Sequence, residues 1–251
     1  IYENRVYNGV GKADPAAEIK FGPNIKDWPD MIALTDNLLL KVASVINDPV
    51  TTTDELIPSG ETSSYRSNPL GLAEFTLSRK DPEYVGRAKA IQQVERTREA
   101  GSCLCETSDE MKNIIETIKK SYPNVKGKNL GYGSTIFAVK PGDGSAREQA
   151  ASCQKVLGGW ANIAKEYATK RYRSNLINWG MLPFVMDEDY AFDVNDYVFV
   201  PDIVAAIKEK KDIIKAYVVN KDMHEISLTL GALTDDERDI ILAGCLINYY
   251  K

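Results

Sequence analysis

A short glycine turn in the middle of the chain carries residue types suited to binding an anion. The turn, residues 142–144, lies between a predicted strand over residues 134–139 and a predicted helix over residues 145–157. Free backbone N–H groups and the positive end of the helix dipole converge at such a point. Ser145 adds a hydroxyl there and Arg147 adds a guanidinium. Together these donors can hold a carboxylate or an oxyanion.

The same residues also support a purely structural interpretation. Ser145 and Glu148 have the spacing of a capping box, in which the serine hydroxyl satisfies an N–H of the first helical turn. On spacing alone this interpretation is favoured. The turn also lacks the Gly-x4-Gly-Lys-Ser/Thr spacing with which a loop surrounds a polyphosphate.

Three separated segments resemble motifs of the aconitase family, in the family's order. Residues 142–148, GDGSARE, resemble its Gly-Glu-Gly-Ser-Ser-Arg-Glu motif. Residues 173–183, RSNLINWGMLP, resemble the stretch that carries Asn-Leu, a glycine and Leu-Pro. Residues 52–60, TTDELIPSG, resemble its Thr-Thr-Asp-His-Ile-x-x-x-Gly segment. The chain is therefore similar to the C-terminal swivel domain of that family.

The resemblance implies a hydro-lyase that moves water across a carbon–carbon bond of a hydroxy di- or tricarboxylic acid. Its cofactor would be a [4Fe-4S] cluster acting as a Lewis acid. In that family the cluster and its cysteine ligands belong to N-terminal domains that this chain does not contain. We therefore expect no metal ligands here, and we expect those domains as partners, on the same chain or on another subunit.

The resemblance also assigns roles to four residues by position. Ser145 matches the family's catalytic base, and Arg147 matches an arginine that holds a substrate carboxylate beside it. Arg66 matches a further carboxylate-binding arginine, and Asp54 matches an acidic active-site residue. A serine is a poor base unless its alkoxide is stabilised, and helix-start amides with two arginines provide that field.

Some positions depart from the family's motifs. Ala146 replaces a serine, Asp143 replaces a glutamate, Gln149 replaces a histidine, and Glu55 replaces the histidine after the acidic residue. Ala146 removes a hydroxyl that would face the substrate. A hydroxy acid other than citrate or isocitrate therefore stays open as the substrate.

Hydrophobic periodicity predicts alternating strands and helices. Strands are predicted over residues 37–47, 134–139, 161–164, 182–186, 197–200, 213–219 and 226–230. Helices are predicted over residues 81–100, 107–122, 145–157 and 167–178, with a last helix that opens at a Thr234/Glu237 capping box. Asp81 before Pro82, and a capping box of Thr107 and Glu110, are expected to start the first two helices.

The segments between these elements complete the expected architecture. Residues 51–68, rich in Thr, Ser, Pro and Gly, predict a long loop, which is a candidate site because long loops in compact domains are often functional. Residues 1–30 mix glycines and prolines without a sustained period and predict an extended arm or linker. We therefore expect an α/β fold, a swivel-type β/β/α layered domain over residues 31–251.

The composition excludes several classes of protein. The 251 residues are 43% hydrophobic and 27% charged, which is ordinary for a globular protein. With 31 Lys and Arg against 36 Asp and Glu, the chain lacks the positive charge that non-specific nucleic-acid binding needs. The single histidine, His224, excludes metal sites built on two or more histidines.

Cysteine use and hydropathy indicate the compartment. Four cysteines in a chain of this length fit a reducing compartment, so we expect Cys103 and Cys105 to be free thiols and the protein to be cytoplasmic. No apolar run is long enough for a membrane span, and no signal pattern opens the sequence, which predicts a soluble protein. The first residue is Ile1 rather than Met, which fits a processed product or a piece of a longer chain.

Two other functions remain open alternatives. The chain could be the separate small subunit of an isopropylmalate-isomerase-type enzyme, although its arm and its length favour the fused form. It could also be an RNA-binding relative of aconitase, against which the acidic pI and the lack of a basic aromatic patch argue.

Overall fold

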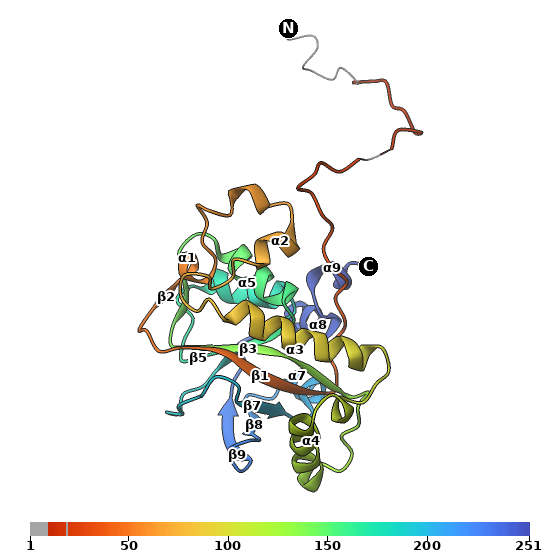
Figure 1. The fold of residues 1–251 in the computed structure, drawn as a ribbon. Helices are drawn as coiled ribbons and strands as arrows, with labels where there is room; N and C mark the ends of the chain where they lie inside the picture. The colour runs from red at the N-terminus through yellow and green to blue at the C-terminus, as the bar shows by residue number, and fades with distance from the viewer. Residues whose placement is uncertain (1–9, 19) are drawn as a thin grey trace.

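The computed structural model describes residues 10–18 and 20–251 of the chain (Figure 1). Part of the predicted arm, residues 1–9 and 19, lies outside the described residues. The described residues of the arm form no helix or strand before the first strand of the domain. The arm contacts the domain at Trp28, whose ring lies 4.3 Å from that of Trp179, centroid to centroid, and at Lys26, whose N–H donates to the Ser67 carbonyl at 2.9 Å.

A curled seven-stranded sheet forms the centre of the molecule. In spatial order its strands are β6 (Leu182–Val185), β5 (Gly159–Ala164), β3 (Leu130–Ala138), β1 (Asn37–Ile46), β7 (Tyr197–Val200), β8 (Ile214–Val218) and β9 (His224–Leu228). The first four run parallel to one another, whereas β7, β8 and β9 pair antiparallel. A bridge between Val185 and Thr229 joins the two ends of the sheet.

Both faces of the sheet are buried, and β1 shows why. Its side chains alternate in direction, so Leu39 and Ala43 enter one hydrophobic cluster, while Leu38, Leu40 and Val42 enter the other. The first cluster lies under α3 (Tyr84–Glu99), α4 (Asp109–Ser121) and α5 (Arg147–Val156). The second lies against α7 (Ile203–Lys208) and α8 (Asp235–Ala243). Figure 1 shows α3 lying across β1 and β3.

The mixed α/β fold predicted from the sequence is therefore confirmed. The seven predicted strands are present, with their ends displaced by a few residues, and β3 starts four residues earlier than expected, at Leu130. Predicted helices appear as α3, α4, α5, α6 (Lys170–Asn178) and α8, and the Thr234/Glu237 capping box of α8 is confirmed. The sequence missed the short helices α2 (Pro69–Ala73), α7 and α9 (Leu246–Tyr249).

The caps expected for α3 and α4 were wrong. Asp81 does not cap α3, which begins at Tyr84; its carboxylate instead accepts hydrogen bonds from Ser44 Oγ and from Arg87. Helix α4 is capped by Ser108, one residue after the expected Thr107, whose hydroxyl donates to the Leu104 carbonyl. Asp81 and Thr107 each bind another partner instead of capping a helix, and the sequence spacing does not reveal that partner.

The prediction of free thiols at Cys103 and Cys105 was also wrong. The two residues form a disulfide, because the 3-10 turn η2 (Leu104–Glu106) brings their Cα atoms to 5.2 Å. Cys153 and Cys245 are free and buried. As for the membrane, none of the helices in the described residues has the length and apolar character needed to span a bilayer.

Candidate functional site

The glycine turn lies against the segment that carries Asp54 and Arg66. Strand β4 (Pro141–Asp143) pairs in parallel with β2 (Thr51–Thr52), so two stretches about 90 residues apart in sequence lie side by side. Residues 142–144 were expected as a turn only, and β4 corrects that expectation because part of the turn is hydrogen-bonded to β2.

Two glycines allow this close approach. Gly142 has φ +96°, and a Cβ there would lie 2.3 Å from the ring of Tyr172 on α6. Gly144 has φ +135°, and a Cβ there would lie 2.2 Å from Thr53 Oγ1. Only glycine combines positive φ with the missing side chain that both contacts require. The turn is therefore fixed between α6 and the start of α1 (Thr53–Leu56).

Ser145 does not cap the helix that follows the turn. Helix α5 begins at Arg147, its N-cap residue is Ala146, and no side chain hydrogen-bonds its first turn. Glu148, the expected partner in a capping box, instead accepts a hydrogen bond from Trp179 Nε1 at 3.0 Å. The capping-box interpretation was therefore wrong. The Ser145 side chain is exposed, and its hydroxyl has no hydrogen-bond partner in the part of the chain that the structure describes.

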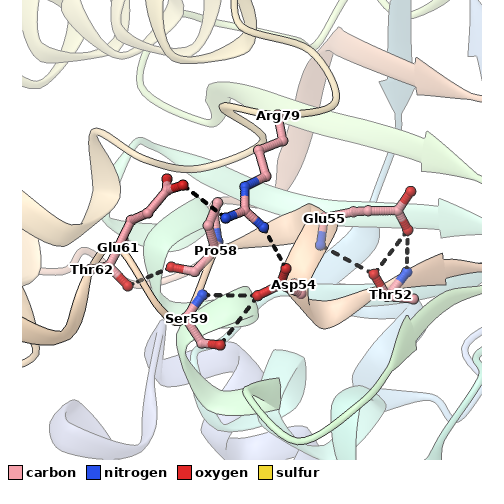
Figure 2. Close-up of polar contacts among 8 residues, drawn as sticks. All are labelled: Thr52, Asp54, Glu55, Pro58, Ser59, Glu61, Thr62 and Arg79. Atoms are coloured by element: carbon pink, nitrogen blue, oxygen red, sulfur yellow. Dashed lines mark hydrogen bonds and ion pairs between the residues drawn. The ribbon is translucent and has the colours of Figure 1, made fainter.

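The segment of residues 51–68 is more ordered than the predicted loop. It contains β2, the single-turn helix α1 and the 3-10 turn η1 (Ser63–Tyr65). A capping box starts α1, with Glu55 N–H donating to Thr52 Oγ1 at 3.2 Å and Thr52 N–H donating to the Glu55 carboxylate at 2.7 Å (Figure 2). Thr62 Oγ1 then donates to the Pro58 carbonyl at 2.6 Å. These local bonds hold the segment that delivers Arg66.

Asp54 is part of this framework. Its Oδ1 accepts hydrogen bonds from Ser59 N–H at 3.0 Å and Ser59 Oγ at 3.2 Å, and its Oδ2 pairs with Arg79 Nη1 at 2.7 Å. Arg79 also binds Glu61 at 2.8 Å, as Figure 2 shows. The Ser59 amide, followed by the Ser59 hydroxyl and Arg79, lowers the pKa of Asp54 below its usual value. Asp54 therefore stays ionised and fixes the turn after α1.

A cavity of about 280 Å³ lies between the 51–68 segment and the glycine turn. Arg66 and Ser145 both line it, although 79 positions separate them in sequence. The other lining residues are Ile57, Ser59, Thr62, Leu72, Ala146 and Gln149. The structure thus brings together a guanidinium and a serine hydroxyl in one concave site. Among the described residues, the Arg66 side chain has neither an acidic partner nor a hydrogen bond.

Arg147 and Asp54 do not line this cavity. Arg147 is half-buried at the first position of α5, two residues from Ser145, and its Nε is buried without a hydrogen-bond partner within residues 10–18 and 20–251. An unpaired buried guanidinium N–H is costly, so the position is one that an anionic group would stabilise.

Motif reasoning missed several residues that shape the site. Arg79 and Glu61 hold the segment, but no local spacing links either of them to Asp54. Ser59 and Thr62 line the cavity, and the only signal for them was the length of the predicted loop. Ala146 and Gln149, the two departures from the family's motif closest to Ser145, both line the cavity as well.

The described residues do not fit an iron–sulfur cluster. Within them, no group of three or more His, Cys, Asp or Glu side chains is arranged to hold a metal ion. Two of the four cysteines are joined in the Cys103–Cys105 disulfide, and the other two are buried. The described residues therefore offer no ligand set for a cluster bound to this chain.

Comparisons with known proteins identify relatives of this chain. The family model described as "Aconitase C-terminal domain" matches residues 135–189, which include the glycine turn, Ser145 and Arg147. The chain is 26% identical over 229 residues to aconitate hydratase A of Rickettsia bellii, a match that covers 83% of this chain and 25% of that protein. The chain thus spans about a quarter of the length of that relative.

Two archaeal proteins are also similar. The chain is 33% identical over 139 residues to the methanogen homoaconitase small subunit of Methanocaldococcus jannaschii, covering 55% of this chain and 67% of that protein. The crystal structure of 3-isopropylmalate dehydratase (LeuD) from the same organism superposes with a TM-score of 0.51 at 22% identity, covering 85% of this chain and 93% of that one. The structural match supports the fold. The sequence match to the homoaconitase small subunit, together with the matched C-terminal domain model, shows that the chain belongs to the aconitase family.

Proposed function

We propose that this chain is the substrate-binding swivel domain of an aconitase-like hydro-lyase, which dehydrates and rehydrates a hydroxy di- or tricarboxylic acid. The observation that carries the proposal is the cavity lined by both Arg66 and Ser145. A carboxylic acid substrate needs a cationic anchor, and a hydroxyl beside it is placed to exchange a proton with the bound molecule.

Each residue has a distinct role in this proposal. Arg66 pairs with one substrate carboxylate through its planar guanidinium. The free N–H groups at the start of α5 stabilise the Ser145 alkoxide, which takes up the proton that leaves carbon and becomes the neutral hydroxyl, while the negative charge passes to the substrate. Arg147, at the first position of α5 and two residues from Ser145, adds positive charge beside the substrate site, although it does not line the cavity. Asp54 is a positioning residue, because it holds the segment that presents Arg66.

The proposal requires partner domains. Members of the aconitase family generally use a [4Fe-4S] cluster, which supplies Lewis-acid activation of the substrate hydroxyl when it is bound. The described residues do not hold such a cluster, so we infer that other domains hold it, either on the same chain or on a partner subunit. A cytoplasmic location belongs to the same proposal: the buried Cys153 and Cys245 are free, which fits a reducing compartment, whereas the Cys103–Cys105 disulfide does not favour one.

The separate small subunit is the second candidate. The homoaconitase small subunit, 33% identical over 139 residues, is a relative of that form. The longer sequence match to aconitate hydratase A, 229 residues, supports the fused form. The two forms share the same site and differ in where the cluster is held.

Activity of the reconstituted enzyme tests the proposal. The protein is assembled anaerobically with its cluster-holding domains, iron and sulfide, and hydroxy acids are screened for an unsaturated product that absorbs in the ultraviolet. Arg66→Lys should lower kcat/KM about tenfold, since a two-point hydrogen-bonded pair becomes a single contact. Arg171→Lys is the matched control, because Arg171 is exposed on α6 and lies outside the cavity.

The outcomes separate the parts of the proposal. If no hydroxy acid is turned over by an enzyme with full cluster content, the hydro-lyase assignment is wrong. If turnover is normal but Arg66→Lys behaves like Arg171→Lys, Arg66 faces solvent and the cavity is not the carboxylate site. Assembly that requires a separately encoded cluster protein would favour the small-subunit form.

A further inference from the structure

The Cys103–Cys105 disulfide is the only cystine within the described part of the chain, and it closes over a single residue. Both cysteines are partly exposed, whereas Leu104 between them is fully buried in the hydrophobic core. The disulfide therefore lies at the surface, and Leu104 between the two cysteines packs the turn against the hydrophobic core. Nothing in the proposed hydro-lyase chemistry uses it.

Hydrogen bonds that do not involve the sulfur atoms also hold the turn that carries Cys103 and Cys105. Glu106 N–H donates to the Cys103 carbonyl at 3.0 Å, and Thr107 donates to the Leu104 carbonyl through its N–H at 3.2 Å and through its hydroxyl at 2.7 Å. These bonds do not involve the sulfur atoms, and Leu104 is buried, so we expect the turn to persist when the disulfide is reduced. The two thiols then stay close enough for the bond to re-form without a search through other conformations.

The two sulfurs are not equivalent. Cys103 Sγ accepts a hydrogen bond from Cys105 N–H at 3.3 Å, and no comparable donor faces Cys105 Sγ among the described residues. A hydrogen bond to a sulfur stabilises its thiolate form. The donor is a backbone group, so it is retained in the reduced protein. Cys103 is therefore the better nucleophile and the better leaving group of the pair.

We propose that Cys103 and Cys105 form a redox-active thiol–disulfide exchange site, whose co-reactant is a low-molecular-weight thiol and its disulfide. In the oxidising direction the Cys103 thiolate attacks the small disulfide, forms a mixed disulfide and releases one thiolate. The Cys105 thiol then loses its proton to water, attacks Cys103 Sγ and displaces the second small thiolate. The protein dithiol loses two electrons, and one small disulfide becomes two thiols. Cytosolic disulfides, where they occur, are usually transient in this way.

Equilibrium trapping of the unmodified full chain is the first test, with reduced and oxidised glutathione as the probe. The folded protein is equilibrated at a series of ratios, quenched with an alkylating reagent and analysed by peptide mass spectrometry. We expect a reversible two-electron transition confined to Cys103 and Cys105. Cys153 and Cys245 are internal controls: both are buried, and burial raises the pKa of the Cys153 thiol to about 12, so neither should label in the folded state.

Two results of this test would overturn the proposal. Labelling of Cys103 and Cys105 at every ratio would show that they do not pair. A bond that resists millimolar glutathione and dithiothreitol while the fold stays native would be a structural crosslink.

Single-cysteine reactivity is the second test. The alkylation rate of Cys103 in the Cys105→Ser variant is compared with that of Cys105 in Cys103→Ser, at one neutral pH. Suppose that the backbone hydrogen bond raises the thiolate fraction of Cys103 about tenfold. A more acidic thiol is also intrinsically about threefold less nucleophilic, so Cys103 should react about threefold faster than Cys105. Equal rates, or a faster Cys105, would refute the assigned roles. The trapping experiment needs no variant, so the proposal remains testable if either variant misfolds.

Discussion

Replacing Ser145 with alanine separates a catalytic hydroxyl from a structural one. The structure gives the expected loss of stability directly, because the Ser145 side chain is exposed, α5 has no side-chain cap, and no hydrogen bond is removed. We expect the free energy of unfolding to change by less than about 0.5 kcal/mol. A helix cap would instead contribute about 1 kcal/mol, or about 2 to 4 °C in melting temperature for a domain of this size.

The expected effect on turnover is much larger. Loss of a general base lowers kcat by roughly 10² to 10⁴, which corresponds to about 2.7 to 5.4 kcal/mol of transition-state stabilisation. Substrate binding should persist, since Arg66 still lines the cavity. We therefore expect KM to change little while kcat collapses.

Both quantities are measured on one preparation of the assembled enzyme, with cluster content equal to that of the wild type. Ser227→Ala, an exposed serine on β9, is the control and should change neither. Near-normal turnover with a melting temperature lowered by several degrees would refute the reasoning, because the hydroxyl would then be structural despite its lack of partners.

Two further predictions concern stability of the chain itself. Burial lowers the pKa of Lys155 to about 7. Between this value and the ordinary lysine pKa, Lys155 is protonated in the unfolded chain but neutral in the folded one. The free energy of unfolding should therefore rise with pH across that interval. The Trp160 ring, 3.6 Å from Lys155 Nζ, favours the charged form by up to about 2 kcal/mol and should reduce this pH dependence of stability. Lys155→Met should abolish the pH dependence, as measured by chemical denaturation at pH 7 and pH 9. An unchanged difference between the two pH values would show that Lys155 is not its source. Gly144→Ala should destabilise the fold by roughly 2 to 4 kcal/mol, because its φ is positive and the new Cβ meets Thr53. In a thermal melt Gly127→Ala, where a Cβ meets nothing within 4 Å, should be near neutral, and equal effects of the two substitutions would show that the turn is not tightly packed.

Local sequence patterns determined most of the elements. The aliphatic run of β1 predicted a buried strand, and the alternation of its side chains supplies both hydrophobic clusters. The Thr234/Glu237 capping box was predictable because both partners lie within one helical turn. The motif that surrounds Ser145 likewise indicates the family from the sequence alone. These signals depend on interactions between residues close in sequence, or on burial alone.

The tertiary structure decided which partner each polar side chain takes. Ser145 and Glu148 have the spacing of a capping box, yet Trp179, 31 residues away, takes the Glu148 carboxylate. Asp54 was predicted at the active site but is bound by Arg79 from another segment. Polar side chains have several possible partners of similar energy, so their choice depends on which segments the fold brings into contact. The position of Arg66 and Ser145 in one cavity is decided in the same way, because it follows from the pairing of β2 with β4 rather than from any local pattern.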